Sequence, residues 1–307
     1  MPRPQSPQQN RKTSNTAEDG GAAGRIPGKE KPVKPKKEQT GFRHLATALA
    51  CVLLALSLGG CSNQSGNPDP AQWRSWRIGV PLAWGADYYL TDYEKLPLLY
   101  RYDDGSECLM GLKFGYIDAI VVDDLYAQEI VRLNPELTIL DEPVGQDQCI
   151  AYVSTERQDL LEEINDFIPD FRESGEYADL CLRSEAGEFV PNEDIPAVED
   201  GPLLRVALAV STGNYPYAYY DFNTDSPQGV DVEFVKQFAA AYGYAIEWYD
   251  SDWDACAVAL TNHQVDLFVG GCSVYYAKEE EEAGSALCSN PYFDMDLVLI
   301  VDWEEET

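Results

Sequence analysis

Apolar runs and amphipathic segments take turns along most of the chain. Short apolar runs, typical of buried β-strands, occur at 76–80, 117–122, 136–140, 148–154, 203–210, 244–249, 265–271 and 296–301. Segments with helical periodicity lie between them, at 105–115, 124–133, 157–183, 231–243 and 252–264. Strands that alternate with helices predict parallel α/β sheets, in which ligands bind at the carboxyl ends of the strands.

Three local features refine this pattern. Pro169 predicts a kink or a break in the long helical segment 157–183. Residues 184–202 lack periodicity and are rich in acidic residues and proline, so they are predicted to be a linker. Residues 112–124 and 260–272 place a helix end, an aspartate and an apolar strand in the same order, which indicates a weak internal repeat.

The first 60 residues have the pattern of an export signal. Basic residues from Arg25 to Arg43 precede the apolar run 44–60, which is shorter than the roughly 20 residues that span a bilayer. The end of this run, "LGGC", resembles the lipobox of bacterial lipoproteins, in which Cys61 becomes the lipidated first residue. An uncleaved membrane anchor is the alternative, and either interpretation places the rest of the chain outside the cytoplasm. Residues 61–75 are then a polar tether.

The chain is strongly acidic, with 22 Lys/Arg, 53 Asp/Glu and a formal net charge of −31. Ten of the basic and four of the acidic residues lie in the first 60 positions. The rest therefore has 12 basic and 49 acidic residues, a net charge of −37. Such a surface repels nucleic acids and anionic lipid headgroups, so binding to nucleic acid is excluded.

The residues available for chemistry are few. Six cysteines follow Cys61, an even number that favours disulfides in an exported chain. There is no CxxC pair, and His263 is the only histidine after residue 60. The chain therefore has few of the residues that a zinc site or a Ser-His or Cys-His catalytic pair requires. Residues 221–232 begin like a calcium loop but have Ser226 at the sixth position and Val232 at the twelfth. We therefore predict no metal, no cofactor and no hydrolase.

Residues 203–301 resemble the first lobe of the extracellular solute-binding proteins of the polar amino-acid uptake family, which has the type II periplasmic-binding fold. The stretches that carry the resemblance are, in order, "LLRVALAV", "YPYAYYDFN", "GVDVEFVKQFAAAYG", "DWDACAVALTNHQVDLFVGG" and "SNPYFDMDLVLIV". In the first half, "WRIGVPLAWGADYYL", "YDDGSECLMGLKFGYIDAIVVDD" and "ELTILDEP" resemble the second lobe of the same family.

The resemblance implies one bilobed α/β domain, two lobes joined by hinge strands, in circularly permuted order. Its expected parts are the second lobe at 76–147, the return hinge strand and closing helix on the first lobe at 148–183, the linker between the old termini at 184–202, and the first lobe at 203–307. Such rearrangement is tolerated where termini lie close together at the surface. The alternative is a fusion of two incomplete neighbours, which would aggregate or swap into a dimer. The permuted chain is expected to be a monomer.

In this family, a first-lobe arginine and backbone N–H groups hold the carboxylate of an amino-acid ligand, and a second-lobe aspartate holds its ammonium. Asp123 stands where that aspartate is expected, although it is alternatively the cap of a helix that begins near Asp124. The arginine is absent. Lys278 falls at the position of this arginine, but an ammonium cannot form the bidentate hydrogen bonds that a guanidinium forms with a carboxylate. The alternative is that Lys278 is a solvated surface lysine with no contact to the ligand. Gly271 and Ser273 still offer a backbone donor and a hydroxyl.

The second lobe departs from the family as well. Gly85 and Asp87 stand in a turn where the family often has Gly-Thr-Thr, and an acid there would repel a carboxylate. We therefore expect a less acidic or cationic ligand. Tyr217 matches the stacking aromatic residue of the family. Three further residues are expected near the ligand: Asn214, Tyr219 and Trp84.

The resemblance also suggests how the cysteines pair and what the protein does. Cys272 and Cys288 fall on neighbouring segments near the family's cleft and are predicted to bond, with Cys149 and Cys181 as a second pair. The predicted function is a lipid-anchored extracellular solute-binding protein on the outer face of the cell membrane. It would capture a small nitrogenous solute, an amino acid or a related compound, for a membrane permease of the ABC type. The alternatives are a sensing module that signals to a membrane partner without transport and, less favoured, an enzyme on the same fold.

Overall fold

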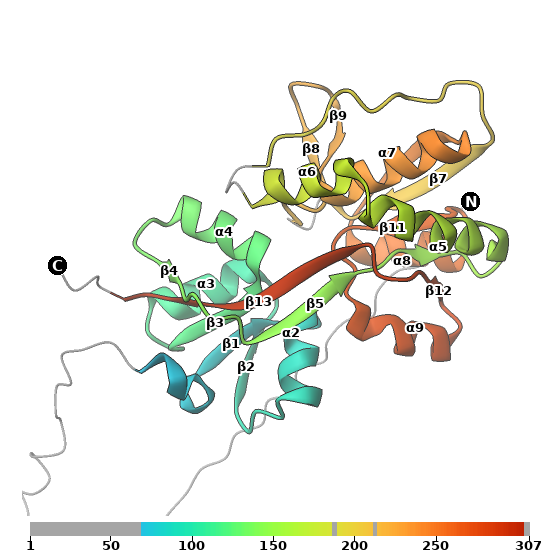
Figure 1. The fold of residues 1–307 in the computed structure, drawn as a ribbon. Helices are drawn as coiled ribbons and strands as arrows, with labels where there is room; N and C mark the ends of the chain where they lie inside the picture. Colours follow the sequence, from blue (N-terminus) through green and yellow to red (C-terminus); the bar gives the residue numbers. More distant parts are fainter. Residues whose placement is uncertain (1–68, 186–188, 211–213, 304–307) are drawn as a thin grey trace, which may run out of the picture. The chain divides into compact units, whose positions relative to one another are not determined.

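The alternating strands and helices form two mixed β-sheets, which we call sheet A and sheet B (Figure 1). The computed structural model describes residues 69–185, 189–210 and 214–303, and all of them belong to one compact unit that spans residues 65–307. We refer to sheet A with the helices packed on it as lobe A, and to sheet B with its helices as lobe B.

Sheet A combines parallel and antiparallel strands. Its order is β2 (Leu99–Tyr102), β1 (Ile78–Pro81), β3 (Ala119–Asp123), β13 (Phe293–Val301) and β4 (Thr138–Ile139), and β5 (Gly145–Cys149) also pairs with β13. β1 runs parallel to β2 and β3, as predicted. β13 runs antiparallel to β3, β4 and β5. The prediction of parallel pairing therefore holds for only half of this sheet, because β13 enters it from sheet B and not through a helix.

Sheet B has the same mixed character. Its order is β10 (Ala245–Asp250), β7 (Leu203–Leu208), β11 (Leu267–Val269), β6 (Tyr152–Val153) and β12 (Leu287–Cys288). β7 is parallel to β10 and β11, whereas β6 is antiparallel to β11 and β12. A separate hairpin joins β8 (Tyr219–Asp221) to β9 (Ser226–Gln228).

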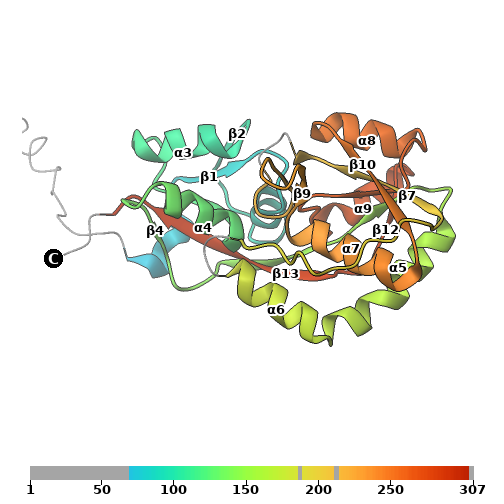
Figure 2. The ribbon, with the colours of Figure 1, turned by 90° about the horizontal axis from the view of Figure 1, so that it is seen from above.

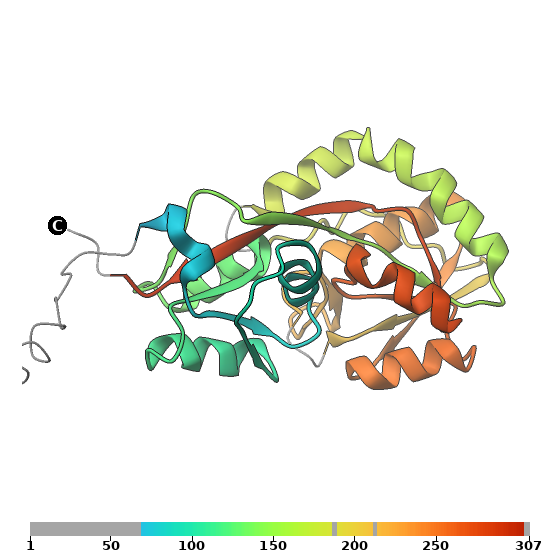
Figure 3. The same ribbon diagram turned by 90° about the horizontal axis from the view of Figure 1, so that it is seen from below.

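The chain crosses between the sheets twice. Residues 150–151 connect β5 to β6, and residues 289–292 connect β12 to β13. The strand predicted over 148–154 is therefore two strands, because the chain leaves one sheet and joins the other within it. β5 and β13 lie side by side where they approach the crossings, with Phe293 paired to Cys149 (Figures 1 and 3).

Helices occupy most of the segments between strands, as the periodicity predicts. They are η1 (Pro70–Ser75), α2 (Gly85–Tyr88), the π-helix η2 (Tyr89–Tyr93), α3 (Gly105–Lys113), α4 (Asp124–Leu133), α5 (Gln158–Arg172), α6 (Gly175–Ser184), α7 (Val230–Tyr242), α8 (Trp253–Thr261), η4 (Val274–Tyr276) and α9 (Ala277–Ala283). Residues that favour helix ends stand at several of these termini. Asp104 and Asp252 accept backbone N–H groups at the starts of α3 and α8, and Gly243 ends α7 with a φ of 80°.

The long segment 157–183 is divided, but not at Pro169. α5 continues through Pro169 to its end at Arg172. The break falls at Ser174, whose Oγ accepts the N–H of Tyr177 at 3.1 Å and starts α6. A favourable cap thus decides the position of the break, and the proline is accommodated near the end of α5.

Both sheets are covered on both faces. In sheet B, Val206 and Leu208 point to the side of α5 and α7, whereas Ala207 and Phe268 point to the side of α8. Figure 2 shows α8 on one side of these strands and α5 and α7 on the other. Sheet A is covered in the same way, by α2 and η2 on one face and by α3 and α4 on the other. This double covering explains why the central strands read as continuous apolar runs.

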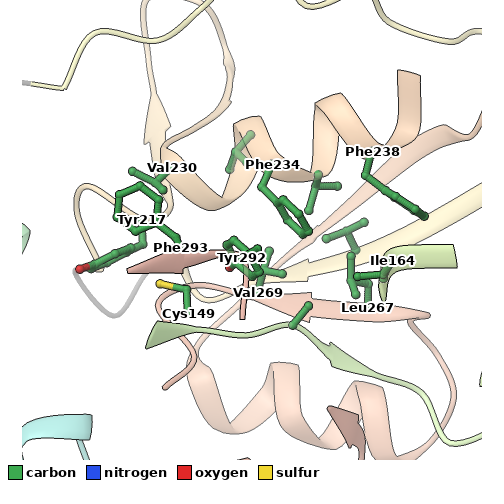
Figure 4. Close-up of a cluster of buried hydrophobic side chains, with 14 of the residues drawn as sticks. Cys149, Ile164, Tyr217, Val230, Phe234, Phe238, Leu267, Val269, Tyr292 and Phe293 are labelled. Atoms are coloured by element: carbon green, nitrogen blue, oxygen red, sulfur yellow. The ribbon is translucent and has the colours of Figure 1, made fainter. Parts of the chain in front are cut away.

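The largest core lies in lobe B, between α5, α7 and the strands (Figure 4). At its centre the rings of Phe234 and Tyr292 stack with centroids 3.9 Å apart and planes only 5° from parallel. Tyr292 belongs to the crossing into β13, so this pair fixes the crossing against α7. Phe238 and Ile164, from α7 and α5, extend the same core.

The predicted linker contains no helix or strand in its described part, residues 189–202. It is held to lobe B at its start. Phe189 is buried in the core of that lobe, and the N–H of Asn192 donates to Glu233 of α7 at 2.7 Å. Arg183 of α6 binds the same carboxylate with two nitrogens, at 2.8 and 2.7 Å. The last turn of α6, the linker and α7 therefore meet at one buried glutamate.

The weak internal repeat corresponds to a structural one. Asp118 precedes β3 and accepts the backbone N–H and the guanidinium of Arg77, which precedes β1. In lobe B, Asp266 precedes β11 and accepts the same groups of Arg205 in β7. Each lobe thus ties the two central strands of its sheet together with one aspartate and one arginine.

Candidate functional site

A cavity of about 480 Å³ lies at the carboxyl ends of the parallel strands of both sheets. It is lined by the turn after β1, by Asp123 at the end of β3, and by Gly270 and Gly271 after β11. Its volume is in the range of small-molecule sites. The position is the one that the alternation of strands and helices predicts.

Asp123 caps α4, as the alternative interpretation has it, and it also lines the cavity. Its Oδ1 accepts the N–H of Tyr126 at 2.9 Å, so it caps α4. The same oxygen accepts the hydroxyl of Tyr217 from lobe B at 2.6 Å, and both side chains line the cavity. Burial raises the pKa of the Asp123 carboxyl and the pKa of the Tyr217 phenol. The cap and the contact between the lobes use one carboxylate.

A second carboxylate of the cavity, Asp147, was not predicted. It lies in β5, next to the crossing, and is only 4% exposed. Its Oδ1 accepts the hydroxyl of Ser273 from lobe B at 2.8 Å and the N–H of Gln148 at 2.7 Å. Burial raises the pKa of Asp147 to about 6. The polar run "GQDQ" before the apolar "CIAY" was the signal that an acid stands in this strand.

Gly85 lines the cavity and lies close to this carboxylate. A Cβ on Gly85 would lie 1.8 Å from Oδ2 of Asp147 and 2.7 Å from Oγ of Ser273. A side chain at this position would therefore displace Asp147 of lobe A and Ser273 of lobe B, or the turn after β1 itself. Trp84, the preceding residue, lines the cavity with its ring 4.9 Å from that of Tyr126, edge to face.

Asn214 and Gly271 line the cavity, but the backbone donor expected of Gly271 is already used. Its N–H donates to Oδ2 of the buried Asp231 at 2.6 Å. Asn214 donates through Nδ2 to the carbonyl of Gly270 at 3.0 Å. These two bonds fix the glycine loop, in which Gly270 and Gly271 have φ angles of 149° and 75°. The loop shapes the cavity and leaves no free N–H at Gly271.

Three predicted ligand contacts lie elsewhere. Lys278 is the solvated lysine of the alternative interpretation, because its side chain is 83% exposed and pairs with Glu282 one turn along α9. Tyr219 lies in β8, with its ring 5.0 Å from that of Tyr215, and does not line the cavity. Asp87 is buried, but its carboxylate binds Arg101 at 2.8 Å and holds the fold of lobe A.

The two predicted disulfides are not formed, since all six cysteines among the described residues are free. The Sγ of Cys149 contacts Sδ of Met295 at 3.6 Å, and the thiols of Cys272 and Cys288 lie against the carbonyl oxygens of Phe268 and Ala277. Cys149 does not reach Cys181 because β5 pairs with β13, which turns the Cys149 side chain toward Met295 and away from α6.

The charge of the cavity has one sign. Among the described residues that line it, the acidic side chains are four aspartates, and no lysine, arginine or histidine joins them. Two of these aspartates, Asp103 and Asp104, are solvent-exposed, whereas Asp123 and Asp147 lie inside. In the described part of the chain no group of three or more His, Cys, Asp or Glu side chains is arranged to hold a metal ion.

The predicted export signal, residues 1–60, and the lipidation site Cys61 lie outside the described residues. In the part that the structure covers, every helix is too short or too polar to cross a bilayer.

Comparison with known proteins identifies one family. Residues 206–306 match the bacterial extracellular solute-binding proteins, family 3. The chain is 27% identical over 106 residues to a probable histidine-binding protein of Neisseria gonorrhoeae, an alignment that covers 34% of the chain and 37% of that protein. It is 28% identical over 100 residues to the L-cystine-binding protein TcyJ of Escherichia coli K12, an alignment that covers 32% of this chain and 38% of that protein.

These alignments span under two fifths of the length of the curated relatives. Among solved structures, the chain is similar to the probable amino-acid ABC transporter extracellular-binding protein ytmK of Bacillus subtilis. That similarity has a TM-score of 0.39 and 9% identity, with 75% of this chain and 85% of the other covered. The names in the family and among these relatives are those of solute-binding proteins and not of enzymes. The part of the chain that matches the model of the bacterial extracellular solute-binding proteins, family 3, therefore includes α7, α8, β11 and the crossing into β13.

Proposed function

We propose that the chain is a lipid-anchored extracellular protein that captures a small nitrogenous solute, an amino acid or a related compound, and delivers it to a permease of the ABC type. The observation that carries this proposal is the cavity at the carboxyl ends of the strands, which both lobes line. Such a site binds by enclosure and needs no reactive group. The match to this family and the binding proteins among the relatives of the chain support the same conclusion.

The contacts across the cavity support a mechanism in which the lobes close over the solute. Tyr217 binds Asp123, Ser273 binds Asp147, and the hydroxyl of Tyr275 donates to the carbonyl of Gln146 at 2.6 Å. A bound solute that contacts both lobes would stabilise this closed arrangement, because its binding energy depends on closure. Ligand should therefore raise the melting temperature of the protein.

We also propose that the order of the segments is circularly permuted, with the second lobe at 76–147 and the first lobe at 203–307. The linker supports this, because it connects α6 to β7 within lobe B. The path of β13 supports it as well, because this strand leaves lobe B at Tyr292 and pairs with β3, β4 and β5 in sheet A. The permuted protein would be a monomer with a complete cavity. Sedimentation equilibrium should therefore give the mass of one chain, and a stable swapped dimer would contradict the proposal.

The experiment that tests the function is a thermal-shift screen of the full chain in mild detergent, with the twenty amino acids, simple amines and short peptides at millimolar concentration. We expect at least one of these probes to raise the melting temperature by several degrees, with no consumption of the probe. If none of them shifts it, or if a probe is turned over, the proposed binding function is wrong.

The anchor has a separate test, since it concerns a different part of the chain. Cells that express the protein would be labelled with a radioactive fatty acid. We expect label in the wild-type chain and none in the Cys61→Ser variant, which should be released from the membrane. A variant that stays bound would instead favour an uncleaved membrane anchor.

A further inference from the structure

The two interior carboxylates of the cavity are those of Asp123 and Asp147, and no lysine, arginine or histidine among the described residues pairs with either. Their hydrogen bonds come from hydroxyl groups of lobe B, those of Tyr217 and Ser273, and from backbone N–H groups of lobe A. Buried carboxylates are normally paired with a cation, because removing a charge from water is costly. A cation that enters the cavity from outside the protein would supply the missing partner.

We propose that the cavity selects a compact organic dication, a short alkyl chain with an ammonium group near each end and no carboxylate. One ammonium would bind Asp123 and the other Asp147. This inference rests on the proposed function, which it narrows to one class of solute.

The aromatic walls of the cavity fit such a solute. Trp84, Tyr126, Tyr217 and Tyr276 line it together with Met295, so that an alkyl chain would meet apolar surface between the two carboxylates. Aromatic faces also attract cationic groups directly. A spacer of methylene groups is therefore favoured over a polar one.

The same cavity disfavours a free carboxylate. Two hydrogen-bond donors were expected to hold a ligand carboxylate, and neither can do so. Lys278 lies in the solvent, and the N–H of Gly271 already donates to Asp231. At the turn after β1, the N–H of Ala83 donates to Asp87 at 3.2 Å. A ligand carboxylate would thus lose its water next to two carboxylates of the protein and gain no cation in return.

Negative charge around the entrance of the cavity also favours a cationic ligand. Asp103 and Asp104 are exposed where they line it, and α9, with its run of glutamates at 279–282, follows directly after the lining residues Ser273 and Tyr276. A negative field at the entrance of a cleft raises the local concentration of cations and speeds their association. A dication would gain more from this field than a zwitterion, whose net charge is zero.

Three probes that differ by one group separate the possibilities: 1,5-diaminopentane, pentylamine, which lacks one ammonium, and L-lysine, which adds a carboxylate. Binding to the full chain would be measured by calorimetry at pH 7.5 and low salt. We expect the diamine to bind at least 100-fold more tightly than either of the other two.

The outcomes distinguish this inference from the proposed function. Tighter binding of L-lysine or of a neutral amino acid would overturn the dication and leave the binding function intact. Equal affinities for the diamine and pentylamine would overturn the second ammonium site. If no amine or amino acid binds at all, the proposed function itself fails.

Variants locate the second charge. Asp147→Asn should lower the affinity for the diamine at least 30-fold and change the affinity for pentylamine less than 5-fold. The ratio of the diamine affinity to the pentylamine affinity should therefore fall sharply. Asp296→Asn is the matched control. Asp296 lies one residue after Met295 on β13, the strand paired with β5, and does not line the cavity. The melting temperature of each variant would show that it is folded, and an unchanged ratio in a folded Asp147→Asn protein would refute the role of Asp147.

The pH dependence gives an independent readout. Asp147 must be ionised to bind an ammonium, and burial holds its pKa at about 6 in the absence of ligand. The affinity for the diamine should therefore rise between pH 5 and pH 7.5, with proton release on binding at pH 6. Asp123, Asp103 and Asp104 face the same cavity, and the pKa of Asp123 is also raised by burial. An affinity that is constant over this range would contradict the proposal.

Discussion

Replacing Arg183 with methionine should destabilise the protein through the glutamate that it leaves behind. The side chain of Glu233 is fully buried, and Arg183 reaches it from α6 with two short hydrogen bonds. The N–H of Asn192 is the third group that binds this carboxylate. In the variant, Glu233 keeps the N–H of Asn192 but loses the guanidinium that forms its salt bridge.

The magnitude follows from the burial of the pair. Removing one partner of a buried ion pair costs about 3–5 kcal/mol, because the remaining charge is left without compensation. The side chain of Arg183 is 18% exposed and Asn192 remains, so we expect the lower end, about 3 kcal/mol. For a chain of this size that corresponds to a fall in melting temperature of roughly 6–12 °C. The second pair of Arg183, with the exposed Asp179, adds only about 0.3–0.5 kcal/mol.

The assay is urea unfolding of wild type, both single variants and the double variant Arg183→Met/Glu233→Gln, followed by circular dichroism at pH 7. The double variant should recover to within about 1 kcal/mol of wild type, because neither charge remains buried. Lys278→Met is the control, since it removes a cation from an exposed pair one turn apart and should cost less than about 0.5 kcal/mol. If Arg183→Met costs no more than this control, α6 is not docked on α7 through Glu233 and the expected place of the closing helix is wrong.

Three further changes test the site and its surroundings. Burial and the neighbouring Asp123 raise the pKa of Asp124 to about 7, above its value in the unfolded chain, so its contribution to stability is present below about pH 4 and is lost as the pH rises through 7. Asp124→Asn should therefore be stabilised relative to wild type by about 2–4 kcal/mol more at pH 8 than at pH 4 in urea unfolding, and a constant difference would contradict this. Tyr217→Phe removes the hydroxyl that binds Asp123 and should cost about 1–3 kcal/mol at pH 7.5 in the same assay, whereas an unchanged stability would show that the contact does not form in solution. Gly85→Ala places a Cβ 1.8 Å from Oδ2 of Asp147 and 2.7 Å from Oγ of Ser273, so the lining of the cavity must shift. The variant should weaken binding of any cavity ligand more than 10-fold in calorimetry, and a normal affinity would refute the tight packing around Gly85.

Local sequence was a good guide to the elements. The strands β1, β3, β7 and β11 and the helices α3, α4, α7 and α8 fall where the hydrophobic periodicity predicts them. The short strand β2 and the π-helix η2 were missed, because the segment 89–102 mixes polar and aromatic residues without a clear period. The antiparallel half of each sheet was missed as well, since the direction of a strand depends on where the chain comes from and not on its own residues.

The candidate site could be predicted in part. Asp123, Trp84, Gly85, Asn214, Gly271, Ser273 and Tyr217 all line the cavity. Asp147 was missed because its strand supplies the cavity only after crossing between the sheets, and Lys278 was misplaced because its helix turns it to solvent. The cysteine pairs were wrong for a similar reason. An even number of cysteines predicts pairing only if the fold brings them together.

By itself, the sequence of this protein determined which segments bury apolar faces, where helices begin and end, and how strongly acidic the surface is. These properties depend on neighbouring residues and on composition, so they can be read without knowing the fold. Only the tertiary structure decided that two carboxylates face one cavity without a cation, that the N–H of Gly271 is already bound, and that Glu233 joins α6, the linker and α7. The physical reason is that a charge or a donor acquires its role from what surrounds it after burial, and those surroundings come from residues far apart in the chain.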